Sequence, residues 1–139
     1  MAAYPQVMFR PALWSTRAGR AFSEIGDAGP HELAIFEAQA RSKEWPLYEV
    51  YVEGEAVGFV LWSVEVEGND TSININAAAA RPVAGVDITR AIVLAFTGLA
   101  EKMGSRAVRC WTVREGLRRK LENMGARSRY VMEIEINGR

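Results

Sequence analysis

The stretch DITRAIVLAFTGLAEKMG, residues 87–104, has the pattern of one amphipathic helix with both ends marked. Asp87 suits the N-cap, because its carboxylate can accept hydrogen bonds from the first free backbone N–H groups. Gly104 suits the position after the last turn, where a left-handed backbone is common. We therefore expect a long helix with one buried face, formed by Ile88, Ile92, Phe96, Leu99 and Met103.

The residues after this helix predict a strand, a short helix and a last strand. Residues 107–113 are β-prone, and residues 114–124 form a basic helix that stops at Gly125. Residues 130–136 alternate apolar and charged side chains. A strand, a helix and a strand in this order imply a right-handed crossover, and therefore a parallel pair of strands inside a mixed sheet. The inward side chains of the basic helix are expected to be Leu117, Leu121 and Met124.

Towards the N-terminus the sequence predicts an edge strand and two helices. Residues 6–13 are apolar with a proline inside, which edge strands tolerate. A first helix that begins around Arg17 and ends near Gly26 or Gly29 can be capped by Ser15 or Thr16. A second helix over residues 30–41 carries a proline in its first turn, where the missing N–H costs nothing.

Three consecutive strands are predicted between these helices and the long helix. Residues 48–53 alternate with a period of two, residues 54–55 make a turn, and residues 57–66 return as a hairpin. A turn over residues 68–70 leads to a third strand over residues 72–76. The elements together predict an α/β fold with a mixed, mostly antiparallel, twisted sheet flanked by about four helices.

Length and charge narrow the class of protein. A chain of 139 residues is near the commonest domain size, so residues 1–139 are expected to form a single domain. Seventeen basic and seventeen acidic residues give no net charge that would draw the chain to nucleic acid or an anionic membrane. Residues 48–80 are acidic without any Lys or Arg, whereas basic side chains dominate from Lys102 onward.

The basic half is either a solvated surface or a patch for a phosphate-bearing ligand or an acidic partner. Nucleic-acid binding ranks last, because no reading motif accompanies its basic cluster of Arg114, Arg118, Arg119 and Lys120.

Several single residues favour structural roles. Cys110 is the only cysteine, which excludes an internal disulfide and a cysteine-based zinc cluster, and its β-prone surroundings predict a small buried hydrophobe. His31 stands alone and is expected on the surface, and no metal site is expected. No run reaches the roughly 18 apolar residues of a membrane span, so a cytoplasmic protein is expected. Core residues are expected among Trp14, Trp45, Trp62 and Trp111.

A family resemblance rests on the order of these elements and on residues 120–126, KLENMGA. This segment looks like a late family motif of tyrosine, two polar residues, an aliphatic residue, glycine and phenylalanine. Over nearly the whole chain the pattern resembles the fold of the GNAT N-acetyltransferases. The resemblance implies acyl-CoA in the opening between two splayed strands, with its pyrophosphate on the N-terminus of the long helix.

The chain departs from the family's cofactor loop, which reads Gln or Arg, two residues, Gly, one residue, then Gly or Ala. The loop aligns with residues 84–89 or with residues 81–86, and neither segment matches the pattern. In the alignment with residues 84–89, Asp87 is the departure that weighs most against cofactor binding, because a carboxylate at a helix start repels a pyrophosphate. The positional candidates for acyl-CoA binding are Arg81, Ala84, Gly85, Val86, Asp87, Thr89 and Arg90.

The catalytic groups that the resemblance implies are also altered. The tyrosine that often protonates the departing CoA thiolate aligns with Leu121, which cannot donate a proton. Glu65 or Glu67 could serve as general base, although strand alternation favours a solvent-facing position for each.

A narrower resemblance concerns small GNAT-like internal virion proteins of short-tailed bacteriophages, which also lack the glycine loop. Their late pattern of leucine, two polar residues, an aliphatic residue, glycine and alanine is matched by Leu121, Met124, Gly125 and Ala126. It implies a non-catalytic assembly module without a cofactor, with a protein partner or self-association, in a virion if phage-encoded. The alternative is an acetyl-CoA-dependent N-acetyltransferase with a divergent loop, in which Arg81 or Arg90 meets the phosphates.

Overall fold

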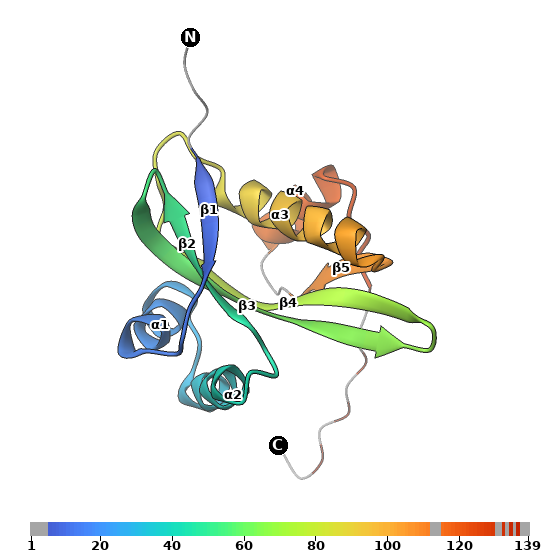
Figure 1. Cartoon of the computed structure of the whole chain (residues 1–139), viewed down its shortest axis with the longest axis horizontal. Helices are drawn as coiled ribbons and strands as arrows, with labels where there is room; N and C mark the ends of the chain where they lie inside the picture. The colour runs from blue at the N-terminus through green and yellow to red at the C-terminus, as the bar shows by residue number, and fades with distance from the viewer. Residues whose placement is uncertain (1–5, 112–114, 130–131, 133, 135, 137–139) are drawn as a thin grey trace.

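The computed structural model describes residues 6–111 and 115–129, together with residues 132, 134 and 136. One five-stranded sheet has the strand order β1-β2-β3-β4-β5 (Figure 1). Neighbouring strands are antiparallel except β4 and β5, which are parallel, so the predicted α/β fold with a mostly antiparallel sheet is confirmed. The strands are β1 Val7–Pro11, β2 Leu47–Val52, β3 Glu55–Glu67, β4 Asp70–Ala80 and β5 Ala107–Cys110.

Helices cover both faces of this sheet. Figure 1 shows α1 and α2 on one face and α3 on the other. Ser15 caps α1, since its hydroxyl accepts the Ala18 N–H at 3.2 Å, and a π-helical turn continues the predicted first helix. The predicted second helix and long helix have the expected bounds. The helices are α1 Thr16–Arg20, η1 Ala21–Ile25, α2 Pro30–Arg41, α3 Ile88–Met103 and α4 Glu115–Asn123.

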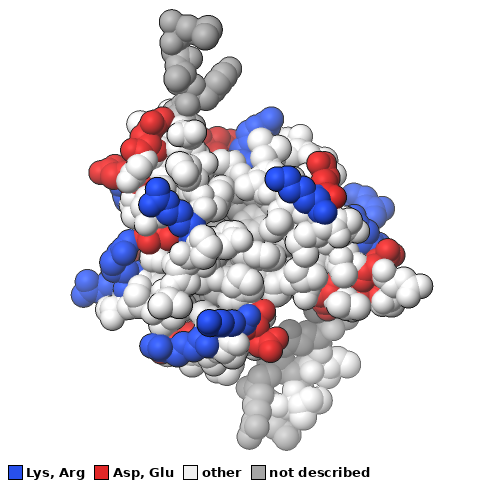
Figure 2. All heavy atoms as spheres, viewed as in Figure 1, with Lys and Arg blue, Asp and Glu red and all other residues white. Residues whose placement is uncertain are grey.

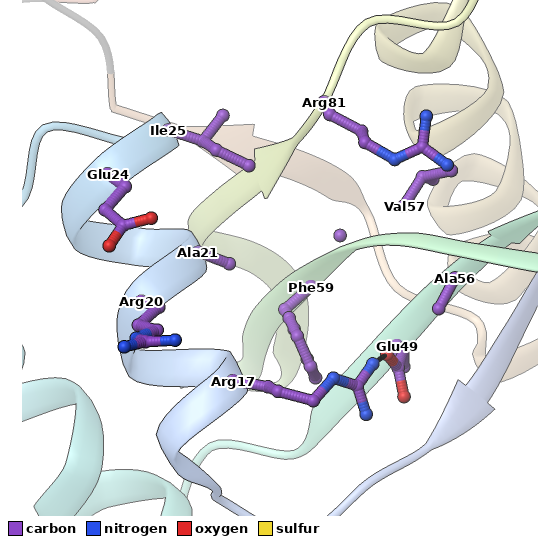
Figure 3. Close-up of a pocket in the computed structure, with 11 residues that line it drawn as sticks. Arg17, Arg20, Ala21, Glu24, Ile25, Glu49, Ala56, Val57, Phe59 and Arg81 are labelled. Carbon is purple, nitrogen blue, oxygen red and sulfur yellow. Dashed lines mark hydrogen bonds and ion pairs between the residues drawn. The ribbon is translucent and has the colours of Figure 1, made fainter.

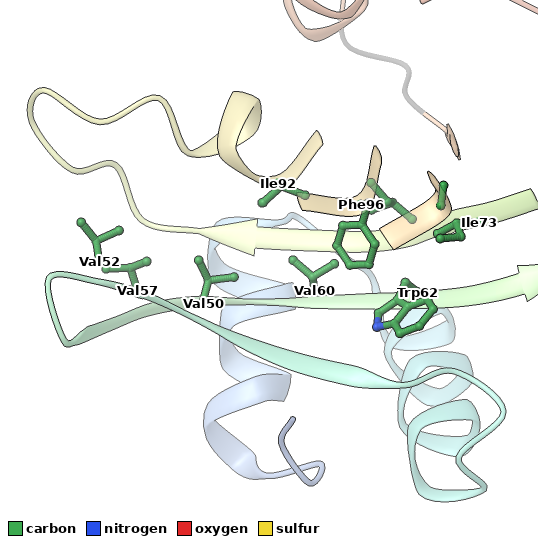
Figure 4. Packing of buried hydrophobic residues seen from close by; sticks show 10 residues of the cluster. Val50, Val52, Val57, Val60, Trp62, Ile73, Ile92 and Phe96 are labelled. Atoms are coloured by element: carbon green, nitrogen blue, oxygen red, sulfur yellow. The ribbon is translucent and has the colours of Figure 1, made fainter. Parts of the chain in front are cut away.

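The sheet separates two apolar cores because strand side chains alternate between its faces. Beneath α3, the side chains of β2, β3 and β4 pack against the helix (Figure 4); the core residues there include Val50, Val60, Trp62, Ile73, Ile92 and Phe96. The core against α1 and α2 includes Ala18, Phe22, Leu47, Phe59 and Leu61. Met103, expected in the buried stripe of α3, is instead 45% exposed, because it lies in the last turn of the helix.

Strand β4 is longer than its predicted five residues, because the alanine run continues the pairing with β3. Ala77–Ala80 lie opposite Gly58–Leu61, and the register shifts between Leu61 and Trp62, which leaves Asn76 unpaired on β4. The strands are so close here that a Cβ added to Gly58 would lie 2.2 Å from the Ala79 carbonyl oxygen. Gly58 is therefore required by this approach.

The C-terminal part differs most from the predictions. Strand β5 ends at Cys110 rather than at residue 113, and residues 112–114 lie outside the described residues. Cys110 is exposed, so its predicted burial is wrong: it occupies the end of a four-residue edge strand. The predicted strand over residues 130–136 falls largely outside the described residues, and its three described positions are exposed and are not in a strand: Met132, Ile134 and Ile136.

Other single-residue expectations can be compared directly. Trp62 is buried, Trp111 is 68% exposed, and His31 lies on the surface as predicted. None of the helices in the described part of the chain has the length and apolar content of a membrane span. The residues described contain no group of three His, Cys, Asp or Glu side chains that could hold a metal ion.

Candidate functional site

The candidate site is the edge of β4 beyond the point where β5 stops pairing with it, and this region is called the wedge below. Strand β5 pairs with β4 only from Ser72 to Ile75. Strand β4 continues to Ala80, and this second half of the strand does not pair with β5. The chain then turns through a loop into α3, whose N-terminus lies at the end of the open edge. Free N–H groups at a helix start attract anions, and the macrodipole adds to that attraction.

The N-terminus of α3 is occupied by a carboxylate that belongs to the chain itself. Oδ1 of Asp87 accepts the backbone N–H of Arg90 at 3.0 Å. The same oxygen lies 2.6 Å from Nζ of Lys120, which extends from α4. The hydrogen bond from Lys120, and after it that from the Arg90 N–H, lower the pKa of Asp87. The group at the helix start is thus an ionised carboxylate paired with an ammonium.

The loop before Asp87 forms a tight turn of its own. The Val86 N–H donates to the Val83 carbonyl at 3.1 Å, and Gly85 has a φ of 76°, in the left-handed region that glycine adopts without strain. Ala84 is exposed, while Thr89 in the first turn of α3 is half-buried. Of the seven positional candidates, the structure therefore joins Asp87 and Arg90 by a hydrogen bond and adds Lys120, which the sequence did not connect with them.

Arg81 is directed elsewhere. Its backbone N–H donates to the Val57 carbonyl at 2.9 Å, and its guanidinium lies 3.2 Å from a Glu55 carboxylate oxygen. Its side chain lines a cavity of about 220 Å³ between η1 and the β2–β3 hairpin (Figure 3). This arrangement gives Arg81 a partner at the hairpin turn and not at the start of α3.

The same cavity is lined by a buried carboxylate, Glu49 on β2, to which the sequence assigns no role. Glu49 is only 7% exposed, because α1 covers this face of β2. Its carboxylate pairs with Arg17, which crosses the Phe59 ring with its guanidinium carbon 5.7 Å from the ring centroid (Figure 3). The Tyr51 hydroxyl also donates to Glu49, at 3.1 Å.

The two candidate bases, Glu65 and Glu67, lie on β3 on the face away from α3. Oε2 of Glu65 accepts a hydrogen bond from Nδ2 of Asn74 on β4 at 2.7 Å. Both oxygens of Glu67 accept from the guanidinium of Arg109 on β5, one of them at 3.1 Å. The hydrogen bond from Arg109 lowers the pKa of Glu67, so this carboxylate is a weak base.

The position that aligns with the family tyrosine is Leu121, near the end of α4. Its side chain is half-buried, and its carbonyl accepts the N–H groups of Met124 and Ala126, both at 3.0 Å. These bonds close the helix ahead of Gly125, whose φ is 99°. The predicted end of the basic helix is thus confirmed, and the Leu-x-x-Met-Gly-Ala segment serves as its C-cap.

The sequence matches no protein-family model and no curated protein. Solved structures resemble the chain over most of its length. A ribosomal-protein-alanine N-acetyltransferase from Brucella melitensis biovar Abortus 2308 has a TM-score of 0.66 and 15% identity, covering 94% of this chain and 99% of that chain. Aminoglycoside N-acetyltransferase AAC(6')-Iy in complex with CoA has a TM-score of 0.66 and 14% identity, covering 99% of each.

A possible acetyltransferase from Clostridium difficile 630 has a TM-score of 0.68 and 11% identity, covering 94% of this chain and 97% of that chain. At identities this low, the resemblance supports a common fold and nothing about function. The backbone arrangement agrees with the element order predicted from the sequence between the first strand and the short basic helix, and the chain therefore has the fold of the GNAT acetyltransferases.

Proposed function

We propose that this chain uses the GNAT fold to bind a protein partner and does not transfer acetyl groups from acyl-CoA. The observation that carries the proposal is the Asp87–Lys120 pair at the start of α3. An acyl-CoA pyrophosphate would need the positive end of this helix. Here the Arg90 N–H already donates to Asp87, and the ionised Asp87 would repel the phosphates.

The neighbouring residues do not fit acyl-CoA either. The loop from Arg81 to Val86 has one glycine, Gly85, whose left-handed conformation serves the loop's own turn. Leu121 has no proton to donate to a departing thiolate. The residues present thus lack the phosphate cradle and the acid that acetyl transfer on this fold would use.

The resemblance of the α4 C-cap to internal virion proteins of short-tailed phages supports assembly in a phage particle as the setting for this binding role. The cap consists of Leu121, Met124, Gly125 and Ala126. A role in assembly requires a docking surface and no chemistry, which agrees with a site whose polar groups are paired with one another.

Isothermal titration of the purified chain with acetyl-CoA and with CoA at low salt tests the proposal. We expect no saturable heat and no thermal shift from either compound. Saturable binding at micromolar concentrations would overturn the proposal. The Asp87→Gly variant is the informative companion, because it removes the repelling carboxylate and leaves the rest of the wedge in place.

The second candidate is an acetyl-CoA-dependent N-acetyltransferase with a divergent loop. The unpaired half of β4 and the CoA complex of a neighbour with the same fold favour it. Arg90 and Lys120 would then meet the phosphates beside α3. This candidate predicts that the wild-type protein binds CoA and that Arg90→Ala weakens the binding. Arg81→Ala should leave the binding unchanged, because Arg81 pairs with Glu55 and lines the separate cavity beside η1.

A further inference from the structure

The outer edge of β1 presents backbone groups that no strand pairs with in the described part of the chain. The Glu53 N–H donates to the Gln6 carbonyl at 3.0 Å, and the Ala12 N–H donates to the Leu47 carbonyl at 2.9 Å. Hydrogen-bonded and non-hydrogen-bonded residues alternate along an antiparallel pair. Between Gln6 and Ala12, the backbone groups of residues 7, 9 and 11 therefore point outward.

The outward N–H and carbonyl groups of one β1 can pair with those of a second β1 that is related to it by a two-fold axis at Phe9. If a second β1 runs antiparallel with Phe9 opposite Phe9, the two Phe9 residues exchange two hydrogen bonds. The Val7 N–H of each copy then faces the Pro11 carbonyl of the other. Pro11 lacks an N–H, so only the Val7 carbonyl stays without a donor. Four backbone hydrogen bonds can thus form along this five-residue edge.

An apolar groove runs beside this edge, between β1 and α3. It has a volume of about 360 Å³, and its aromatic floor includes Phe9 and Phe96, which meet edge to face with ring centroids 6.3 Å apart. Leu94 on α3 lines the groove and is 53% exposed. Figure 2 shows uncharged side chains across the middle of this face and charged ones around its rim.

We propose that this face is a homodimer interface, in which two β1 strands pair antiparallel and the sheets of two copies become continuous. Leu94 of each copy packs against the groove of the other. A second copy is the occupant for two reasons. A single two-fold axis gives the outward N–H groups of residues 7 and 9 carbonyl acceptors on the other copy, and the same axis brings the exposed Leu94 of each copy to the groove of the other. The inference goes beyond the proposed function and holds whether or not the chain binds acyl-CoA.

Sedimentation velocity across a concentration series tests the interface, in a Cys110→Ser background so that the exposed native thiol forms no disulfide. We expect a concentration-dependent dimer for the parent chain and a monomer for Leu94→Glu. The matched control is Val66→Glu, since Val66 is 71% exposed on the β3–β4 hairpin, away from the groove. A monomeric parent, or a Leu94→Glu dimer as stable as that of the control, would overturn the proposal.

Disulfide trapping tests the strand register. In the proposed pairing Met8 of one copy lies opposite Arg10 of the other, with Cα atoms about 4.5 Å apart, which suits a disulfide. An equimolar mixture of Met8→Cys and Arg10→Cys chains should cross-link on mild oxidation, and each variant alone should cross-link far less. Equal cross-linking in all three samples would show that another surface associates, and circular dichroism checks that each variant is folded.

Discussion

Nζ of Lys120 on α4 lies 2.6 Å from Oδ1 of Asp87, the residue that caps α3. One carboxylate oxygen thus caps the N-terminus of the helix that follows β4 and connects that helix to the helix that follows β5. The two residues are 33 positions apart in the sequence, and the crossover through β5 brings them together across the wedge. The stability and pH response of this contact can be measured independently of any ligand.

Asp87→Ala should lower the free energy of unfolding by about 1 kcal/mol, because the Arg90 N–H loses its acceptor at the N-cap. Asp87→Asn should cost less, since the amide oxygen still accepts that hydrogen bond. Urea titration followed by circular dichroism measures both values. Equal losses in the two variants would indicate that the cap bond contributes nothing and that the charge accounts for the whole effect.

The stability difference between the wild type and Asp87→Asn should shrink as pH falls from 6 to 3. The Lys120 hydrogen bond, followed by that of the Arg90 N–H, lowers the pKa of Asp87 below its ordinary 3.8. A depressed folded pKa gives stability that is present above the unfolded pKa and is lost as pH falls through the folded one. Urea midpoints at several pH values measure this difference, and a constant gap would contradict the ionic role of Asp87.

Arg17→Ala should destabilise the chain by about 1–3 kcal/mol, because it leaves the buried Glu49 carboxylate without its cation. The matched control is Arg20→Ala, one turn further along and lining the same cavity, for which an effect near zero is expected. Thermal and urea unfolding give both numbers. The Arg17→Ala/Glu49→Gln double variant should recover part of the loss, and the pair is not coupled if the two single losses simply add.

Gly58→Ala should destabilise the chain by about 2–4 kcal/mol, since its Cβ would lie 2.2 Å from the Ala79 oxygen and 2.5 Å from the Ala80 Cα. Both neighbours are backbone atoms, so no rotamer change relieves the overlap. Gly19→Ala is the control: its Cβ would meet only Trp14, at 3.5 Å, and alanine in α1 should stabilise by up to about 1 kcal/mol. Similar unfolding midpoints for the two variants would refute this account of β3 and β4.

Helix ends were the best predicted features, because their signals are local. Ser15 and Asp87 are N-caps, Pro30 lies in the first turn of α2, and Gly104 is the C-cap of α3, as their chemistry favours. Strand ends were predicted less well, since a strand lasts as long as its neighbour does. Alanines 77–80 carry no strong strand signal, and they extend β4 only because Gly58–Leu61 lie opposite them.

The sequence by itself determined the order of the elements from β1 to α4, the alternation that divides the two cores, the absence of an acid at Leu121 and the carboxylate at Asp87. These follow from residue type and spacing over a few positions. Only the tertiary structure decided that Lys120 pairs with Asp87, that Arg81 pairs with Glu55, that Arg109 pairs with Glu67, and that Glu49 is buried beneath α1. Such contacts join residues tens of positions apart, and Coulomb and hydrogen-bond energies depend on distances that chain folding alone sets.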